Sequence, residues 1–450
     1  LTATNLVINS DENGTGTLVN TGTVTITNPA TVKQYLPSAS ERTWWYLSSP
    51  VTGATSDVFV SNLVGSYDET TRSYTQPFTQ ATTLEKGKGY VVKMTATEAA
   101  IYKFENKTLN DGDISLTLNR SITGTLDSKR GFNLVGNPYP SYIDWDAIHV
   151  ESTNIRDAIW FRTYSGGQMT FHTYSDGEAV PTGVSGKIAP MQAFWVRVDA
   201  DPVSPQTVST GTLTFKNTHR SHFETGANPL KVKAEDISQR LRLVVSNGTA
   251  TDETLLVGKS YAQDVQDSYD IEKMTNSNPA IPEIYSLIQN EELVINSMNA
   301  LSEGKTVELG FRPGQAGNFT IRATQLQNID AQVVLVDNLT GAETDLTAGE
   351  TYSFDSGATD TNSRFSVLFR VPGSTTGVQD ADYGWHVNTS GSRMVITGTK
   401  AGSLIRVYNI MGQQLISAIA TGSHTELSSN FTPGLYLVKV NSQIVKVTAK

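Results

Sequence analysis

Short apolar segments, separated by Gly, Asn and Pro, recur along the whole chain. Leu241–Val245 and Glu253–Val257 are two such segments, and Asn247-Gly248 lies between them. Apolar positions that alternate with polar ones are typical of strands, and Asn-Gly between two strands favours a hairpin. Similar segments continue through 221–372 at intervals of roughly 8–12 residues or a little more, which predicts a two-sheet β-sandwich.

Residues 37–220 contain an internal duplication. The block Arg42–Pro50 resembles Arg130–Pro138 in the order of its aromatic, apolar and proline positions. Three further pairs of blocks follow in the same order: Tyr67–Tyr74 with Tyr164–Phe171, Gly89–Lys93 with Ala193–Arg197, and Tyr102–Asn106 with Leu213–Asn217. The retained order predicts two homologous halves, packed as paired sheets or as two small sandwiches.

The two ends of the chain predict smaller modules. Residues 1–36 contain short apolar triplets broken by Asn13-Gly14 and Thr21-Gly22, as in rungs of a β-solenoid or in a meander. This small number of rungs cannot bury the core of a solenoid. We therefore expect residues 1–36 to be the end of a longer solenoid or a strand pair that packs on the next domain. At the other end, Pro372–Gly377 has the composition of a linker. Residues 378–450 predict a small immunoglobulin-like sandwich.

One predicted strand of 378–450 has two possible orientations. Ile405 and Val407 point to one face of the strand, and Leu404 and Tyr408 point to the other. Both pairs can face a core, so the sequence alone does not choose between the two registers.

The composition excludes several kinds of site. Cys is absent, which excludes disulfides, cysteine nucleophiles, Fe–S clusters and thiolate zinc sites. A net charge of -10 without a local basic run argues against nucleic acid as a partner. The chain also lacks the run of about 18 apolar residues that a transmembrane helix needs. The expected fold class is all-β, with tandem antiparallel β-sandwich domains and a small immunoglobulin-like C-terminal domain.

Three blocks lie close together at the C-terminus, namely Ile405–Gln413, Pro433–Val440, and Lys446-Val447 with the basic end at Lys450. They resemble the type A C-terminal sorting domain of the type IX secretion system of Bacteroidetes. This resemblance implies export across the outer membrane by the type IX secretion machinery, with anchoring at the cell surface or release. The positions that match the sorting signal are Val407, Tyr408, Asn409, Gly412, Gly434, Tyr436, Val438, Lys439, Lys446 and Lys450.

A second resemblance covers the middle of the chain. Gly131–Pro140 with Ile143–Asp146 resembles a block common in large secreted Bacteroidetes surface proteins, and 240–371 resembles the module that usually follows it. Such proteins are mostly described as adhesin-like. The resemblance therefore implies a place at the cell surface more than an activity.

Aromatic residues concentrate in the duplicated region, and four of them are candidates for ligand binding: Trp44, Trp45, Trp160 and Tyr164. Exposed aromatic rings can stack on sugar rings, whereas buried ones build the core of a sandwich. For each residue taken singly, the core is the favoured interpretation. Trp44 and Trp45 are adjacent and face opposite sides of a strand, so one is expected in the core while the other can be exposed.

The acidic and histidine residues of the sequence favour neither a catalytic site nor a metal site. Asp144 and Asp146 lie in a Pro-rich turn, where Asp more often accepts backbone N–H bonds than acts in a glycosidase pair across a cleft. His219 and His222 have no third ligand nearby, so a solvated pair is favoured over zinc. Serine-nucleophile, phosphate-loop and dinucleotide motifs are missing, and no acidic loop has EF-hand spacing. No cofactor is expected.

These features favour a secreted or cell-surface protein that is not an enzyme and has an adhesive or structural role. The expected partners, besides the type IX secretion machinery, are host or microbial surface glycans or proteins. One alternative is a polysaccharide-binding module. Another is the C-terminal portion of a larger secreted hydrolase. The first alternative requires exposed aromatic rings, and the second requires a catalytic domain before Leu1.

Overall fold

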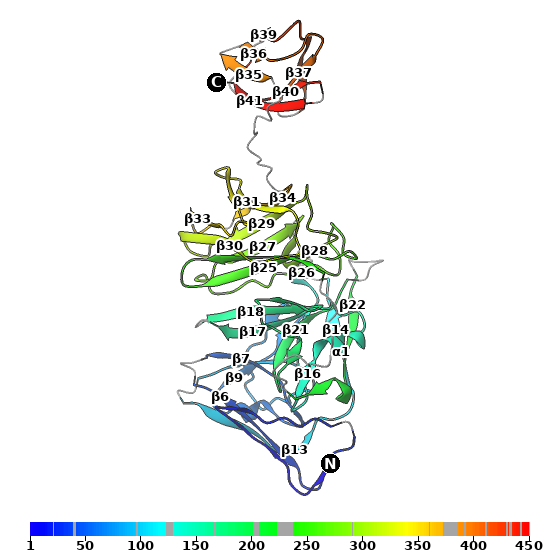
Figure 1. Cartoon of the computed structure of the whole chain (residues 1–450). Helices are drawn as coiled ribbons and strands as arrows, with labels where there is room; N and C mark the ends of the chain where they lie inside the picture. The colour runs from blue at the N-terminus through cyan, green and yellow to red at the C-terminus, as the bar shows by residue number, and fades with distance from the viewer. Residues whose placement is uncertain are drawn as a thin grey trace. The chain divides into compact units, whose positions relative to one another are not determined.

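The computed structural model describes residues 1–20, 22–38, 42–95, 98–122, 129–165, 168–200, 207–222, 237–289, 291–359, 361–371, 385–390, 393–409, 412–428, 431, 434–441 and 443–449. The chain divides into two compact units, unit 1 (Leu1–Val371) and unit 2 (Pro372–Lys450). Regular structure is almost entirely strand, so the fold is all-β, as the sequence predicts (Figure 1). The predicted linker Pro372–Gly377 lies outside the described residues.

The first half of the duplicated region contains two small sheets. One has the order β7 (Trp44–Leu47), β12 (Tyr90–Lys93) and β9 (Leu63–Gly65). The other has the order β2 (Val7–Ile8), β6 (Ala30–Leu36), β13 (Ala100–Leu109) and β8 (Val51–Thr52). The 3-10 helix η1 (Ser56–Phe59) and the hairpin of β10 (Tyr67–Asp68) and β11 (Ser73–Tyr74) complete this half.

The N-terminal strands are hydrogen-bonded to one another and to this half. β1 (Thr2–Ala3) pairs in parallel with β5 (Thr25–Ile26), and β3 (Ser10–Asp11) pairs with β4 (Gly14–Thr15). β2 pairs in parallel with β6, and β6 pairs with β13 over most of its length. Residues 1–36 therefore share a sheet with the duplicated region.

The second half has one larger sheet, in which the strand order of the first half recurs at one end. Its main sheet has the order β15 (Phe132–Gly136), β21 (Ala193–Arg197), β17 (Ile159–Ser165), β18 (Gln168–Ser175) and β19 (Glu178–Val180). β14 (Ile114–Arg120) pairs with β22 (Ser209–Phe215), and β20 (Lys187–Ile188), β16 (Tyr142–Asp144) and β23 (Arg220–Ser221) form a third sheet. The short helices are α1 (Trp145–Val150) and η3 (Asn217–His219).

The two halves share the order of several elements along the chain. The order β15-β21-β17 repeats β7-β12-β9, and the β14–β22 pair repeats β6–β13. α1 follows β16 as η1 follows β8. The second half differs by its longer β17–β18 hairpin and the added β19, which lengthen the sheet at one edge.

Glycines let the two halves approach at backbone distance. A Cβ at Gly136 would lie 2.3 Å from the Cβ of Ser48, and one at Gly89 would lie 2.7 Å from the carbonyl oxygen of Val135. The Gly136 N–H donates to the carbonyl of Gly87 at 2.8 Å. No larger residue fits at either position without moving the neighbouring chain, so this close packing of the halves requires Gly at both.

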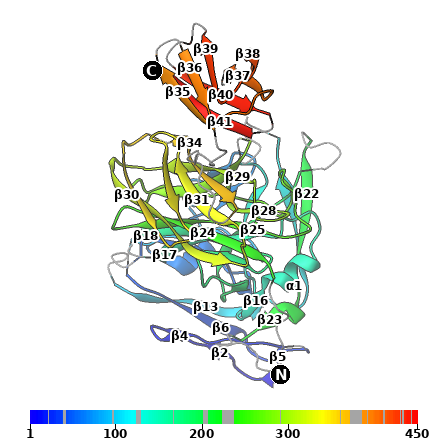
Figure 2. The ribbon, with the colours of Figure 1, turned by 45° about the horizontal axis from the view of Figure 1, so that its top comes forward.

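Residues 239–370 form one continuous sheet that curls around its own core. Its order is β32 (Ala342–Asp345), β31 (Gln332–Asp337), β34 (Thr361–Arg370), β29 (Thr306–Arg312), β27 (Glu283–Ile288), β28 (Glu291–Met298), β25 (Thr251–Gly258), β24 (Gln239–Ser246), β30 (Gly317–Gln327) and β33 (Thr351–Ser356), and β26 (Ile271–Glu272) also pairs with β28. Side chains from β24 and β30 meet those from β29, β31 and β34 in a single apolar cluster. Figures 1 and 2 show the two resulting layers.

This arrangement corrects two details of the sequence prediction. The sandwich is one hydrogen-bonded sheet and not two, because β28 pairs with β27 on one side and with β25 on the other. The β25–β28 pair is parallel, as are β1–β5 and β2–β6, so the sheets are not purely antiparallel. The alternation of apolar residues fixes the faces of a strand, but it does not fix which neighbour it pairs with.

Unit 2 is a two-sheet sandwich. One sheet has the order β35 (His386–Ser390), β36 (Arg393–Thr397), β39 (His424–Ser428). The other has the order β38 (Gln414–Ile419), β37 (Leu404–Asn409), β40 (Gly434–Val440), β41 (Gln443–Ala449). Ile405 and Val407 are fully buried in its core, whereas Leu404 and Tyr408 are only half-buried. The structure thus selects the first of the two registers. None of the helices that the structure describes has the length and apolar character needed to cross a bilayer.

Candidate functional site

One face of the sheet β7-β12-β9 carries aromatic, cationic and small side chains. Lys93 lies opposite both Trp44 and Leu63, and Val91 lies opposite both Tyr46 and Gly65. Alternate residues of a strand share a face, so these positions form one surface. The other face carries Leu47 and Val92 into the core of the first half.

The β10–β11 hairpin forms one wall above this face. Its Tyr74 ring is 42% exposed, and its hydroxyl lies 3.0 Å from that of Tyr46. Tyr67 packs edge-on against both Tyr74 and Trp195, with ring centroids 5.6 and 4.5 Å apart. Burial of the hydroxyl and the nearby Tyr46 raise the pKa of Tyr74 well above its ordinary value, so it remains a neutral hydrogen-bonding group.

The opposite wall comes from two segments that are distant in sequence. Arg162 of β17 places its guanidinium 5.2 Å from the ring centroid of Phe171 and donates from Nη2 to the Ser277 hydroxyl at 2.5 Å. Together the walls and the sheet face enclose a cleft of about 410 Å³, which we call the Trp44 cleft. It is lined by Trp44, Tyr46, Leu63, Val64, Gly65, Tyr74, Thr75, Pro77, Val91, Lys93, Arg162 and Ser277.

The structure separates the four aromatic residues predicted as ligand contacts. Trp44 is 40% exposed and lines the cleft, whereas Trp45 turns away and packs against the core with Arg42 above its ring at 3.9 Å. Tyr164 is 41% exposed and lies on the same strand face as Arg162, about 7 Å farther along β17. It is not part of the cleft lining.

Trp160 requires a correction. Its side chain is completely buried between the second half and the sheet of residues 239–370, and its Nε1 donates to the backbone carbonyl of Glu272 at 3.1 Å. A ring without exposed surface cannot stack on a ligand, so Trp160 is a core residue. Tyr46, Tyr74, Lys93 and Arg162 were missed as cleft residues. Only the period of two linking Trp44 to Tyr46 could have indicated one of them.

The sorting-signal positions fall into two structural groups within unit 2. Those buried in the core are Val407, Tyr436 and Val438. Those half-buried or exposed are Tyr408, Asn409, Gly412, Gly434 and Lys439. Gly412 has φ 77° in the turn between β37 and β38, where the Gln413 N–H donates to the Asn409 side chain at 2.9 Å. Lys446 lies on β41, and Lys450 is outside the described residues.

The acidic and histidine residues considered in the sequence make local structural contacts. The Asp144 carboxylate accepts the Asp146 N–H at 3.2 Å, as expected for a turn, and caps helix α1. Asp146 accepts the hydroxyl of Tyr174 at 3.0 Å. His219 is buried and accepts the Lys216 N–H at 3.2 Å, so the expected solvated pair with His222 is wrong. Within the described ranges, no group of three or more His, Cys, Asp or Glu side chains could hold a metal.

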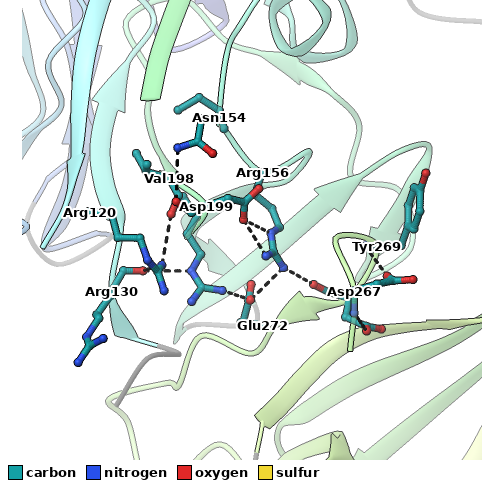
Figure 3. Close-up of polar contacts among 12 residues, drawn as sticks. Arg120, Arg130, Asn154, Arg156, Val198, Asp199, Asp267, Tyr269 and Glu272 are labelled. Atoms are coloured by element: carbon teal, nitrogen blue, oxygen red, sulfur yellow. Dashed lines mark hydrogen bonds and ion pairs between the residues drawn. The ribbon is translucent and has the colours of Figure 1, made fainter. Parts of the chain in front are cut away.

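A buried ionic cluster joins the duplicated region to the sheet of residues 239–370. Glu272 of β26 contacts the guanidinium groups of Arg197 and Arg156, the latter at 3.0 Å (Figure 3). Arg156 also contacts Asp199 at 2.7 Å and donates to the carbonyl of Asp270 at 2.8 Å. The side chains of Glu272, Arg197 and Asp270 are buried, so these contacts fix the position of β26 against the second half.

Asp270 adds a pH-sensitive group beside this cluster. Its carboxyl is completely buried and accepts the backbone N–H groups of Asp267 and Ser297, each at 2.9 Å. Burial raises its pKa from 3.8 to about 7, against a smaller opposing effect from those bonds and Arg156. The folded protein therefore favours the protonated acid. The resulting stability is complete below the unfolded pKa and is lost as the pH rises through about 7.

We expect Asp270→Asn to flatten the pH dependence of stability between pH 4 and 7. The amide resembles the protonated acid, so the variant lacks the loss of stability that ionisation causes in the natural chain. One pKa unit corresponds to about 1.36 kcal/mol, so the difference between the two proteins should change by at most about 4 kcal/mol over this range. Urea unfolding at pH 4, 5, 6 and 7 measures it. Parallel pH profiles would contradict the assignment.

Comparison with known proteins gives a family match and a weak structural similarity. The family model described as Domain of unknown function (DUF8693) matches residues 3–369, nearly all of unit 1. No curated protein matches the chain. The chain is similar at 12% identity to PorZ, an essential bacterial surface component of the type-IX secretion system of Porphyromonas gingivalis, over 84% of this chain and 67% of that one. The TM-score of 0.14 is too low to support a conclusion from this similarity.

Proposed function

We propose that unit 1 of this chain, which belongs to the DUF8693 family of domains of unknown function, is a non-catalytic binding module of a cell-surface protein. Its site is the Trp44 cleft, and its ligand is a saccharide on a host or microbial surface. An adhesive role follows from such binding when the protein is displayed on a cell. Unit 2 serves export by the type IX secretion machinery.

The observation that carries the proposal is the pair of exposed aromatic rings in one concave site. Single exposed apolar residues are ordinary, but Trp44 and Tyr74 are about equally exposed and line the same cleft. Aromatic rings provide a flat apolar face for the C–H face of a sugar, and the cleft also offers the hydroxyl groups of Tyr46, Thr75 and Ser277. Its volume lies within the range of small-molecule sites.

The role of unit 2 is supported by its sequence blocks and by its separation from unit 1. The three blocks that resemble a type A sorting domain all lie in this unit, which is compact by itself. The family match to DUF8693 ends before it begins. A signal that acts independently of its cargo needs this kind of separate fold.

Trp44→Ala is expected to weaken saccharide binding about tenfold or more. An aromatic ring that carries much of the binding contributes about 2 kcal/mol, and about 1.4 kcal/mol corresponds to a factor of ten. A glycan array with the full chain identifies the ligand, and calorimetric titration compares the variant. Tyr269→Ala is the matched control, because this ring is similarly exposed but lies outside the cleft. Equal binding by the natural chain and the Trp44 variant would refute the site.

A further inference from the structure

We infer that the Trp44 cleft selects acidic saccharides, meaning sugars that carry a carboxylate or a sulfate. This inference rests on the proposed function and specifies its ligand. Lys93 and Arg162 both line the cleft, and no Asp or Glu is among those lining residues that the structure describes. The chain as a whole has a net charge of -10, so a cleft with two cations and no acid departs from its general character.

The Lys93 ammonium group lies over an aromatic ring and not beside a carboxylate. Its Nζ lies 5.4 Å from the ring centroid of Trp44, within the range of a cation–π contact. The structure records no ion pair for it with any residue it describes. An anionic group on a sugar bound beside Trp44 would therefore meet this ammonium group.

The Arg162 charge is likewise met by neutral groups. Its guanidinium lies beside the Phe171 ring and donates to the Ser277 hydroxyl, and its Nε is buried without a hydrogen-bond partner. Among the described residues, no carboxylate forms an ion pair with it. A guanidinium is well suited to bind a carboxylate or sulfate, since its N–H groups lie in one plane and can donate in pairs.

Two other partly buried cations of unit 1 form the ion pairs with carboxylates that the cations of the cleft lack. Arg240 forms a two-pronged contact with Glu178, with distances of 2.6 to 3.0 Å. Arg312 contacts both Glu283 and Glu292, at 2.6 and 2.8 Å. These cations stabilise the packing of strands and already have their anions.

The neighbouring cavity gives the closest comparison. It has a volume of about 220 Å³ between β18 and the sheet of residues 239–370, and it also contains a cation, Lys273. Here Asp252 lies 2.5 Å from the Lys273 ammonium group, and Glu253 also lines the cavity. The charges of that cavity are balanced by the protein itself, whereas those of the Trp44 cleft are left for a ligand.

The test compares saccharides that differ only in charge. Oligogalacturonate is titrated into the full chain beside its methyl ester, and a sulfated galactan oligosaccharide beside its desulfated form. We expect the charged member of at least one pair to bind at least tenfold more tightly at low salt, with the difference shrinking as salt screens it. The two pairs distinguish a carboxylate from a sulfate as the recognised group.

Variants assign the charge preference to the two cations. Lys93→Gln and Arg162→Gln should each lower the affinity for the charged sugar several-fold more than the affinity for the neutral form, since each variant removes one cation from the cleft. Lys86→Gln removes the same charge from an exposed position outside the cleft and should have no effect. Equal affinity for both members of each pair, with binding still lost in Trp44→Ala, would overturn the charge selection alone. Absence of binding to any saccharide would overturn the proposed function.

Discussion

Replacing Glu272 with alanine is expected to lower the free energy of unfolding of unit 1 by about 3–5 kcal/mol, the usual cost of removing one partner from a buried ion pair. Glu272 is 2% exposed and contacts both Arg156 and Arg197, the latter also buried. Without this carboxylate, the buried Arg197 and the largely buried Arg156 lose the anion that they share, and Arg156 keeps its contact with Asp199. The loss should appear as a lower urea midpoint of unfolding, because the cluster joins the duplicated region to the sheet of residues 239–370.

The control is an ion pair of the same kind at the surface. Glu85 lies 2.8 Å from Lys88, and its side chain is 65% exposed. Exposed pairs of this kind contribute about 0–1 kcal/mol, so Glu85→Ala should hardly change the midpoint. Glu272→Gln keeps the size of the side chain and removes only the charge, which tests whether the effect is electrostatic. Glu272→Ala and Glu85→Ala variants of equal stability would show that the buried cluster does not hold unit 1 together.

A chain that ends at Val371 should fold normally but fail to reach the cell surface. Unit 1 has its own apolar clusters and is compact without unit 2, so its circular dichroism and unfolding midpoint should remain those of unit 1 in the full chain. In a bacterium with an active type IX system, the truncated protein should stay inside the cell, because the proposed sorting signal is gone. Surface labelling compared with total protein measures the distribution.

A full-length variant distinguishes loss of the signal from loss of length. Val438→Asp places an unpaired charge in the core of unit 2, where Val438 is fully buried, and should unfold that unit and block display. Ile419→Ser changes an exposed residue of the same sheet and should leave display intact if the fold of the unit is what matters. Normal display of the chain ending at Val371 would show that unit 2 is not the sorting signal.

The Trp44 cleft shows how far local pattern can predict a site. Adjacent Trp44 and Trp45 had to face opposite sides of a strand, and the structure places one in the cleft and the other against the core. The pattern could not say that Arg162 and Ser277 would close the cleft, since they belong to segments more than 100 residues apart that meet only through tertiary packing. Trp160 was misplaced for the same reason, because its cover comes from β26 and its neighbours.

The sequence by itself determined the all-β class, the positions of most strands and the order of the duplicated blocks, because alternation and turn residues act over a few positions of the chain. The tertiary structure alone decided which face of each strand is covered, as at Ile405 and Val407, and which strands become neighbours, as in the parallel pair of β25 and β28. It also decided that Glu272 would lie between Arg156 and Arg197. Alternation gives every strand two faces, and only contacts with distant parts of the chain determine which of them water can reach.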